Sequence, residues 1–232
     1  MPALLFHMAY TINNFIHWFF SGICHQIPER TFKYGIWYYP VCGRDTGTYL
    51  GIAFNIIVLF FVYRFRKENP LEFPKKRTNI ILLLLCLPFV IDSIGSFFGI
   101  WDVGNDLRFL SGLLFGSSIS IYLLTAVFNL FTINQYRINI AIFDDLKTLM
   151  YFIIGIIVIC IIFLVKNVFF LFVSALSILF VIWLFNYLII TILLTKKVKI
   201  KFLMVISAVL LAFIELISAA YIKNLLMFRA HL

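Results

Sequence analysis

NIILLLLCLPFVIDSIGSFFGI, residues 79–100, is an apolar run with one charged side chain, Asp92. A helix needs about 20 predominantly apolar residues to cross the hydrocarbon core of a bilayer. The run has that length, and it predicts a membrane-spanning helix.

The composition of the whole chain indicates the same class of protein. Of its 232 residues, 63% are apolar and 12% are charged, whereas a soluble protein has roughly half apolar and a quarter charged residues. A soluble domain is therefore excluded. On either side of residues 79–100, six further apolar runs cover residues 3–24, 46–65, 107–133, 146–165, 168–194 and 202–225. These runs predict an all-α polytopic transmembrane bundle of six or seven helices, because Asn13, Asn14 and His17 interrupt the first run.

The basic residues predict how the chain is oriented in the membrane. The net charge is +9, and twelve of the 19 lysines and arginines follow or flank the cytoplasmic ends of the predicted spans. Cytoplasmic loops carry such an excess, so we expect the N-terminus in the cytoplasm, residues 25–45 outside and the protein in the cell membrane. The basic excess is then topological, and we expect no nucleic-acid partner. The twelve are Arg64, Arg66, Lys67, Lys75, Lys76, Arg77, Arg137, Lys147, Lys196, Lys197, Lys199 and Lys201.

Three runs carry glycines four residues apart near their predicted outer ends. Such spacing lets helix backbones approach closely in lipid, so these three helices are predicted to pack tightly. The pairs are Gly47 and Gly51, Gly95 and Gly99, and Gly112 and Gly116.

Charged residues lie in line with these glycines. Positions three, four, seven or eight apart share a helix face, which directs Arg44, Asp92 and Arg108 into the packed seam. A charge at bilayer depth is costly unless it is paired, so Asp92 is predicted to pair with Arg44 or Arg108. The alternative to a functional pair is one that only fixes helix register. The same spacing aligns Glu215 with the alanines of the last run and predicts that it faces protein.

Two of the four cysteines, Cys24 and Cys42, flank the predicted outer loop. Their spacing leaves four interpretations of these cysteines open. A disulfide would close the loop, and a reactive thiol could be activated by nearby cations. A metal site could use Cys24, His25, Cys42 and Asp45, which are donors that zinc accepts. Unpaired structural cysteines are the fourth alternative.

The same region resembles a family of uncharacterised multi-pass membrane proteins of bacteria and archaea, a domain of unknown function. The family pattern is Cys-His-Gln-x-Pro-Glu-Arg-[Ser/Thr]-Phe followed by Cys-x-Arg-Cys-Thr-Gly-x-Tyr-x-Gly. Asp45 stands at the second cysteine of the second motif, which weakens a redox interpretation, whereas a metal site tolerates a carboxylate there. The family implies no reaction. The matching residues are Cys24, His25, Gln26, Pro28, Glu29, Arg30, Thr31, Phe32, Cys42, Arg44, Thr46, Gly47, Tyr49 and Gly51.

We expect one integral membrane domain over residues 1–232, with a motif-bearing part at 24–120 and additional membrane helices at 134–232. The leading hypothesis is a protein of the bilayer that binds or transports a small molecule or an ion at an outward-facing site. A membrane enzyme acting on an anionic lipid or isoprenoid phosphate, and a structural or assembly subunit, are the alternatives. The sequence leaves the cofactor unknown, and zinc at the loop is the one candidate. The candidate ligand-binding residues are Arg30, Arg44, Tyr49, Asp92 and Arg108.

Overall fold

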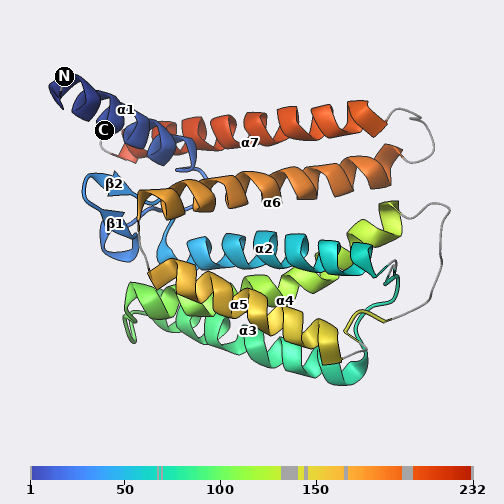
Figure 1. The fold of residues 1–232 in the computed structure, drawn as a ribbon. Helices are drawn as coiled ribbons and strands as arrows, with labels where there is room; N and C mark the ends of the chain where they lie inside the picture. The colour runs from blue at the N-terminus through green and yellow to red at the C-terminus, as the bar shows by residue number, and fades with distance from the viewer. Residues whose placement is uncertain are drawn as a thin grey trace.

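The computed structural model describes residues 2–66, 68, 70–131, 141–143, 146–164, 167–194 and 201–230. Between residues 20 and 42 lie a short 3-10 helix, η1 (Pro28–Arg30), and a hairpin of β1 (Lys33–Tyr34) and β2 (Trp37–Tyr38). Most of the described chain is helical (Figure 1). The helices are α1 (Pro2–Phe19), α2 (Gly43–Phe65), α3 (Lys76–Phe97), α4 (Asn105–Phe131), α5 (Leu146–Leu164), α6 (Val168–Leu194) and α7 (Lys201–Ala230).

Six of these helices, α2 to α7, are long and apolar enough to cross a membrane. The predicted all-α class is therefore confirmed. The end of the predicted run 107–133 and the start of the predicted part 134–232 lie outside the described residues. The same holds for Lys67, Arg137, Lys196, Lys197 and Lys199 of the orientation argument.

Helix α1 differs from the first predicted span. It ends at Phe19 instead of residue 24, and it is not one of the six candidate spans. Polar side chains interrupt its apolar run, and Asn13 is buried because it hydrogen-bonds the hairpin at Ile36 and Tyr38. Figure 1 places the start of α1 at the same end of the bundle as the hairpin. This placement differs from the predicted one, in which the first helix separates the N-terminus from residues 25–45. The side of the membrane on which this end lies stays a prediction.

Helices α2 and α4 form the centre of the bundle. Helix α2 contacts α4, α5 and α6, while α3 packs on α4 and α7 packs on α6. More than half of the apolar window is buried in α2 and α4, 56% in each, against 22% in α3 and α7. Leu59 and Tyr63 of α2 pack with Ile121 and Leu124 of α4 in the largest apolar core. The outer helices therefore offer most of their surface to lipid.

The glycines of α2 and α4 allow these two helices to touch through their backbones. A Cβ added at Gly112 would collide with the carbonyl oxygen of Arg44, and one added at Gly47 would collide with that of Phe109. The close packing predicted for these two stripes is confirmed. This contact brings the first turns of α2 and α4 together at the hairpin end.

The third predicted glycine pair, Gly95 and Gly99, does not form a helix–helix contact. Gly95 of α3 lies against the indole ring of Trp101, and Gly99 lies beyond the end of α3 with φ of 66° and open space around it. The prediction is wrong here because α3 ends at Phe97, so Gly99 serves a turn that glycine adopts readily.

The prediction that Glu215 faces protein is confirmed only in part. Ala208 and Ala212 are buried as expected, but the side chain of Glu215 is exposed, although it accepts a hydrogen bond of 2.9 Å from Asn186. Leu216 continues the buried face at a spacing of four from Ala212, and Glu215 lies at its edge.

Candidate functional site

A buried glutamine folds the chain between α1 and α2 back on itself. Gln26 has a φ of 54°, and its side-chain amide donates hydrogen bonds to the carbonyl oxygens of His17 at 2.6 Å and Pro40 at 2.8 Å. These bonds join the two ends of the loop. Cys24 is thereby brought beside Cys42, which directly precedes α2.

Two other helices hold the same loop. The ammonium group of Lys223 on α7 donates to the carbonyl oxygens of Ser21 at 3.0 Å and Cys24 at 3.1 Å. The side-chain amide of Asn105, at the start of α4, donates to the carbonyl oxygen of Glu29 at 3.0 Å. The loop is therefore a fixed part of the hairpin end of the bundle.

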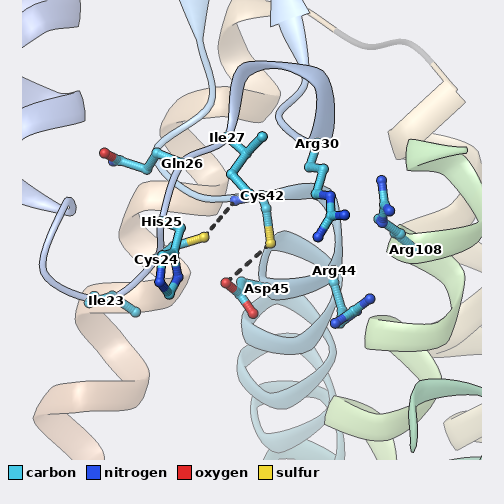
Figure 2. A pocket seen from close by; sticks show the side chains of 10 residues that line it. All are labelled: Ile23, Cys24, His25, Gln26, Ile27, Arg30, Cys42, Arg44, Asp45 and Arg108. Carbon is cyan, nitrogen blue, oxygen red and sulfur yellow. Dashed lines mark hydrogen bonds between the residues drawn. The ribbon is translucent and has the colours of Figure 1, made fainter. Parts of the chain in front are cut away.

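A pocket of about 200 Å³ lies between this loop and the first turns of α2 and α4 (Figure 2). Arg30 comes from η1, Arg44 from α2 and Arg108 from α4, and Figure 2 shows the three guanidinium groups gathered on one side. We call it the arginine pocket. Its lining residues are Ile23, Cys24, His25, Gln26, Ile27, Arg30, Cys42, Arg44, Asp45 and Arg108.

Arg44 is paired with Asp92, as the helical spacing predicted. The Asp92 carboxylate oxygen Oδ2 lies 2.8 Å from Nε and 2.6 Å from Nη2 of Arg44. Ser96, one turn further along α3, donates to Oδ1 of Asp92 and accepts from Arg44, both at 3.3 Å. The side chain of Asp92 is 7% exposed and that of Arg44 is 17% exposed. Asp92 thus lies behind Arg44 and does not line the arginine pocket.

The other two arginines differ from Arg44 in their partners. Arg108 is 3% exposed and forms an ion pair with Asp102, which is 66% exposed. The Nε atom of Arg108 is buried and has no hydrogen-bond partner among the described residues. No carboxylate within the described part of the chain pairs with Arg30.

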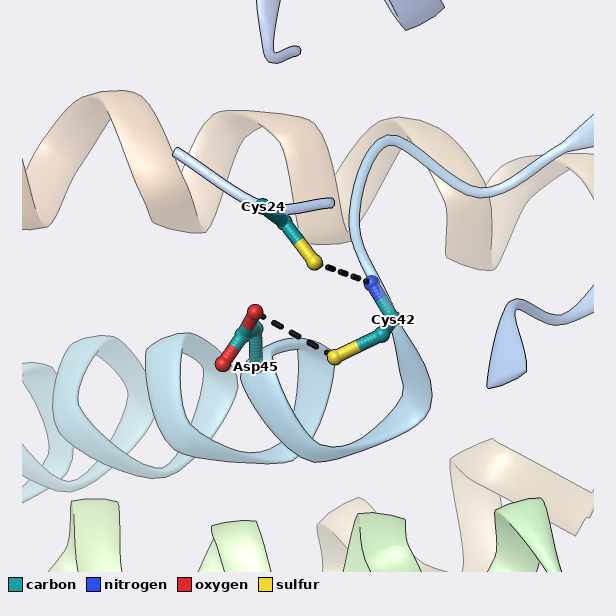
Figure 3. Close-up of side chains that lie close together, drawn as sticks. All are labelled: Cys24, Cys42 and Asp45. Carbon is teal, nitrogen blue, oxygen red and sulfur yellow. Dashed lines mark hydrogen bonds between the residues drawn. The ribbon is translucent and has the colours of Figure 1, made fainter. Parts of the chain in front are cut away.

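Two thiols and a carboxylate form a compact group on the pocket wall (Figure 3). The Sγ atom of Cys24 accepts a hydrogen bond of 3.4 Å from the backbone N–H of Cys42, whose own thiol donates to Oδ2 of Asp45 at 3.2 Å. One donor atom from each residue lies within 4.8 Å of the others, and both cysteines are free. His25 lines the pocket but is not a member of this group.

The two thiols have different acidities. The hydrogen bond from the Cys42 side chain lowers the pKa of Cys24, against the opposing effect of burial. The pKa of Cys42 is raised, because its thiol is hydrogen-bonded to Cys24 and buried. Cys24 is therefore the more acidic thiol of the pair.

The structure does not bring every predicted residue to the pocket. Tyr49 lies on α2 below the first turn and packs against apolar side chains. Lys223 and Asn105 position the loop and were missed, because they are far from it in the chain. The sequence signal for Lys223 is a lone lysine near the end of an apolar run.

Six helices of spanning length, with a polar pocket at one end, define a multi-pass membrane protein. A family model described as "predicted membrane protein (DUF2085)" matches residues 24–122, which contain all the charged residues of the pocket. The chain belongs to this family.

Two archaeal relatives support the assignment. An uncharacterised protein of Methanothermobacter thermautotrophicus is 39% identical over 102 residues, which cover 44% of this chain and 85% of the relative. An uncharacterised protein of Methanocaldococcus jannaschii is 31% identical over 111 residues, which cover 48% of this chain and 67% of the relative. No solved structure matches the chain. The comparisons therefore give the membrane class and no activity.

Proposed function

We propose that the protein binds a small anionic solute in the arginine pocket. The observation that carries this proposal is the gathering of Arg30, Arg44 and Arg108 around one cavity of about 200 Å³. Guanidinium groups recognise carboxylate and phosphate oxygens through paired, charge-assisted hydrogen bonds. With the predicted orientation, the pocket opens to the outside, where a solute for uptake would arrive.

The charge distribution favours an anion. The pocket wall carries three guanidinium groups and one carboxylate, Asp45. Asp92 lies behind Arg44, and Asp102 is 66% exposed, so that water screens its charge. Arg30 has no carboxylate partner within the described part of the chain. The wall therefore presents an excess of positive charge to the cavity.

An unsatisfied donor supports the same ligand class. The Nε–H group of Arg108 is buried without an acceptor among the described residues, and such a donor costs free energy until it is satisfied. A negatively charged oxygen atom of an anion in the pocket would accept a hydrogen bond from this Nε–H group. Because α2 and α4 touch through their glycines, Arg44 and Arg108 are held in place before the ligand arrives.

The test uses inorganic phosphate and the purified full-length protein in a zwitterionic detergent, with binding measured by calorimetry at low ionic strength. Arg30→Gln should weaken phosphate binding roughly ten-fold or more, because one charge-assisted hydrogen bond is worth about 1.5–3 kcal/mol. Lys33→Gln is the matched control, since Lys33 lies in β1 and does not line the pocket. No phosphate binding by the wild type, or equal losses in the two variants, would refute the proposal.

A second candidate ligand is an anionic amphiphile, a lipid or isoprenoid phosphate. A larger cavity of about 520 Å³ shares Ile23, Cys24 and His25 with the arginine pocket. Its remaining wall is mainly apolar. Ala219, Ile222, Lys223 and Leu226 come from α7, and Ser21 and Gly22 come from the segment after α1. Such an amphiphile would occupy both cavities, with its phosphate group in the arginine pocket and its hydrocarbon chain in the larger, apolar one.

Nanodiscs separate the two ligand sources. Retention of phosphatidylglycerol over phosphatidylcholine through purification, measured by mass spectrometry, would favour the amphiphile. Ile222→Trp, which fills the apolar cavity, should reduce that retention and leave phosphate binding unchanged. Retention that survives in the Arg44→Ala/Arg108→Ala variant would exclude the arginine pocket as the headgroup site.

A further inference from the structure

We infer that Cys24, Cys42 and Asp45 form a site for one thiophilic divalent cation of the zinc class. This inference concerns a cation and does not rest on anion binding. The three residues belong to two segments that the Gln26 side chain ties together through its hydrogen bonds to His17 and Pro40, and Lys223 holds the first of these segments at Cys24. Cys42 and Asp45 lie three residues apart, at the N-cap and in the first turn of α2.

The positions of the donor atoms suit a tetrahedral ion. Zinc binds thiolate sulfur at about 2.3 Å and carboxylate oxygen at about 2.0–2.2 Å, which separates neighbouring donors by about 3.5–3.8 Å. In the structure the Cys42 Sγ and Asp45 Oδ2 atoms are 3.2 Å apart, and all three donor atoms lie within 4.8 Å of one another. Side-chain adjustments of about 1 Å would give the required geometry.

The chemical types of the ligand atoms indicate which metals the site would bind. Thiolates favour zinc and other thiophilic ions, whereas magnesium and calcium require oxygen ligands. Cys24, Cys42 and Asp45 supply two sulfur donors and one oxygen donor. Three protein ligands leave one coordination position for water or a solute, as at catalytic zinc sites. The three residues line the arginine pocket, so a bound solute could reach that position.

The neighbouring arginines do not oppose the metal, because binding conserves charge. The metal-free group carries −1, from the Asp45 carboxylate and two neutral thiols. Coordination releases one proton from each thiol, so two thiolates, one carboxylate and one divalent ion again sum to −1. Arg30, Arg44 and Arg108 therefore face the same net charge before and after the metal binds.

The experiment titrates cobalt(II) into the purified full-length protein after chelator treatment under a non-thiol reductant. Thiolate-bound cobalt has a ligand-to-metal charge-transfer absorption in the near ultraviolet. We expect this absorption to saturate at one cobalt per chain and to disappear when zinc is added. The variant Cys86→Ser/Cys160→Ser is the matched control, because these cysteines lie in α3 and α5, outside the group. It should retain the full signal.

Variants of the proposed ligands complete the test. Cys24→Ser/Cys42→Ser should abolish the charge-transfer band, and Asp45→Asn should weaken cobalt binding at least ten-fold. Asp45→Cys supplies a third thiolate and should restore or strengthen the band, which shows that the loop still folds. The inference is overturned if the reduced wild type gives no band or if Cys24→Ser/Cys42→Ser retains it. It is also overturned if protein isolated without reductant contains a Cys24–Cys42 disulfide.

Discussion

Asp92 and Arg44 show what side-chain spacing alone can reveal. Helical periodicity together with the cost of a buried charge predicted that Asp92 pairs with Arg44 or Arg108, and in the structure its partner is Arg44. Arg108 obeys the same spacing but pairs with Asp102, which lies in the turn before α4, where no periodicity applies. Cys24 and Asp45 meet because of hydrogen bonds from Gln26, a contact that no local pattern encodes. The residues could be named from sequence, but not their partners.

Removing the charge of Asp92 tests the ion pair at the residue scale. Asp92→Asn leaves the Arg44 guanidinium, which is 17% exposed, without its carboxylate, so the thermal midpoint in detergent should fall. The double variant Arg44→Gln/Asp92→Asn should lose less than the sum of the single variants, with a coupling of about 0.5–3 kcal/mol. Additive losses would contradict a direct pair.

Helices α2 and α4 pack closely, because their glycines let the two backbones touch at the hairpin end. Their stripes could be predicted from the four-residue spacing. The stripe of α3 could not, because the prediction required the helix to continue past Phe97. The alanine face of α7 was identified correctly, but helical spacing placed Glu215 on that face although it lies at the edge.

The α2–α4 contact predicts unequal effects of two Gly→Ala changes. Gly112→Ala places a methyl group against the carbonyl oxygen of Arg44, forces the helices apart and should destabilise the protein by about 1–3 kcal/mol. Gly104→Ala meets nothing within 4 Å and should change stability little. Thermal unfolding of the two variants in the same detergent measures the difference. Equal midpoints would contradict the close contact.

Across the whole chain, hydropathy predicted the helical runs. The structure separates α1 from α2 to α7, because among the described helices only the latter six are long and apolar enough to span a membrane. The first run contains polar residues that serve the hairpin, such as Asn13, and hydropathy alone does not indicate whether such a helix spans. Because α1 begins at the hairpin end, we expect the N-terminus and residues 25–45 to lie on one side of the membrane. The distribution of basic residues predicts that this side is outside.

Single cysteines in a cysteine-free background test this arrangement in intact cells. A membrane-impermeant maleimide should label His7→Cys and Lys33→Cys directly, and it should label Glu72→Cys only after permeabilisation. Glu72 lies between α2 and α3, at the opposite end of the bundle. If the maleimide labels His7→Cys only after permeabilisation, as expected for Glu72→Cys, then α1 crosses the membrane.

Anion binding in the arginine pocket can be observed directly. A crystal structure of the full-length protein grown with selenate tests it most directly, because anomalous scattering from selenium locates the anion. We expect a peak in the pocket within hydrogen-bonding distance of the guanidinium groups of Arg30 and Arg108, and its loss in Arg30→Gln crystals. Selenate bound elsewhere, with the pocket free of any anion, would contradict anion binding at this site.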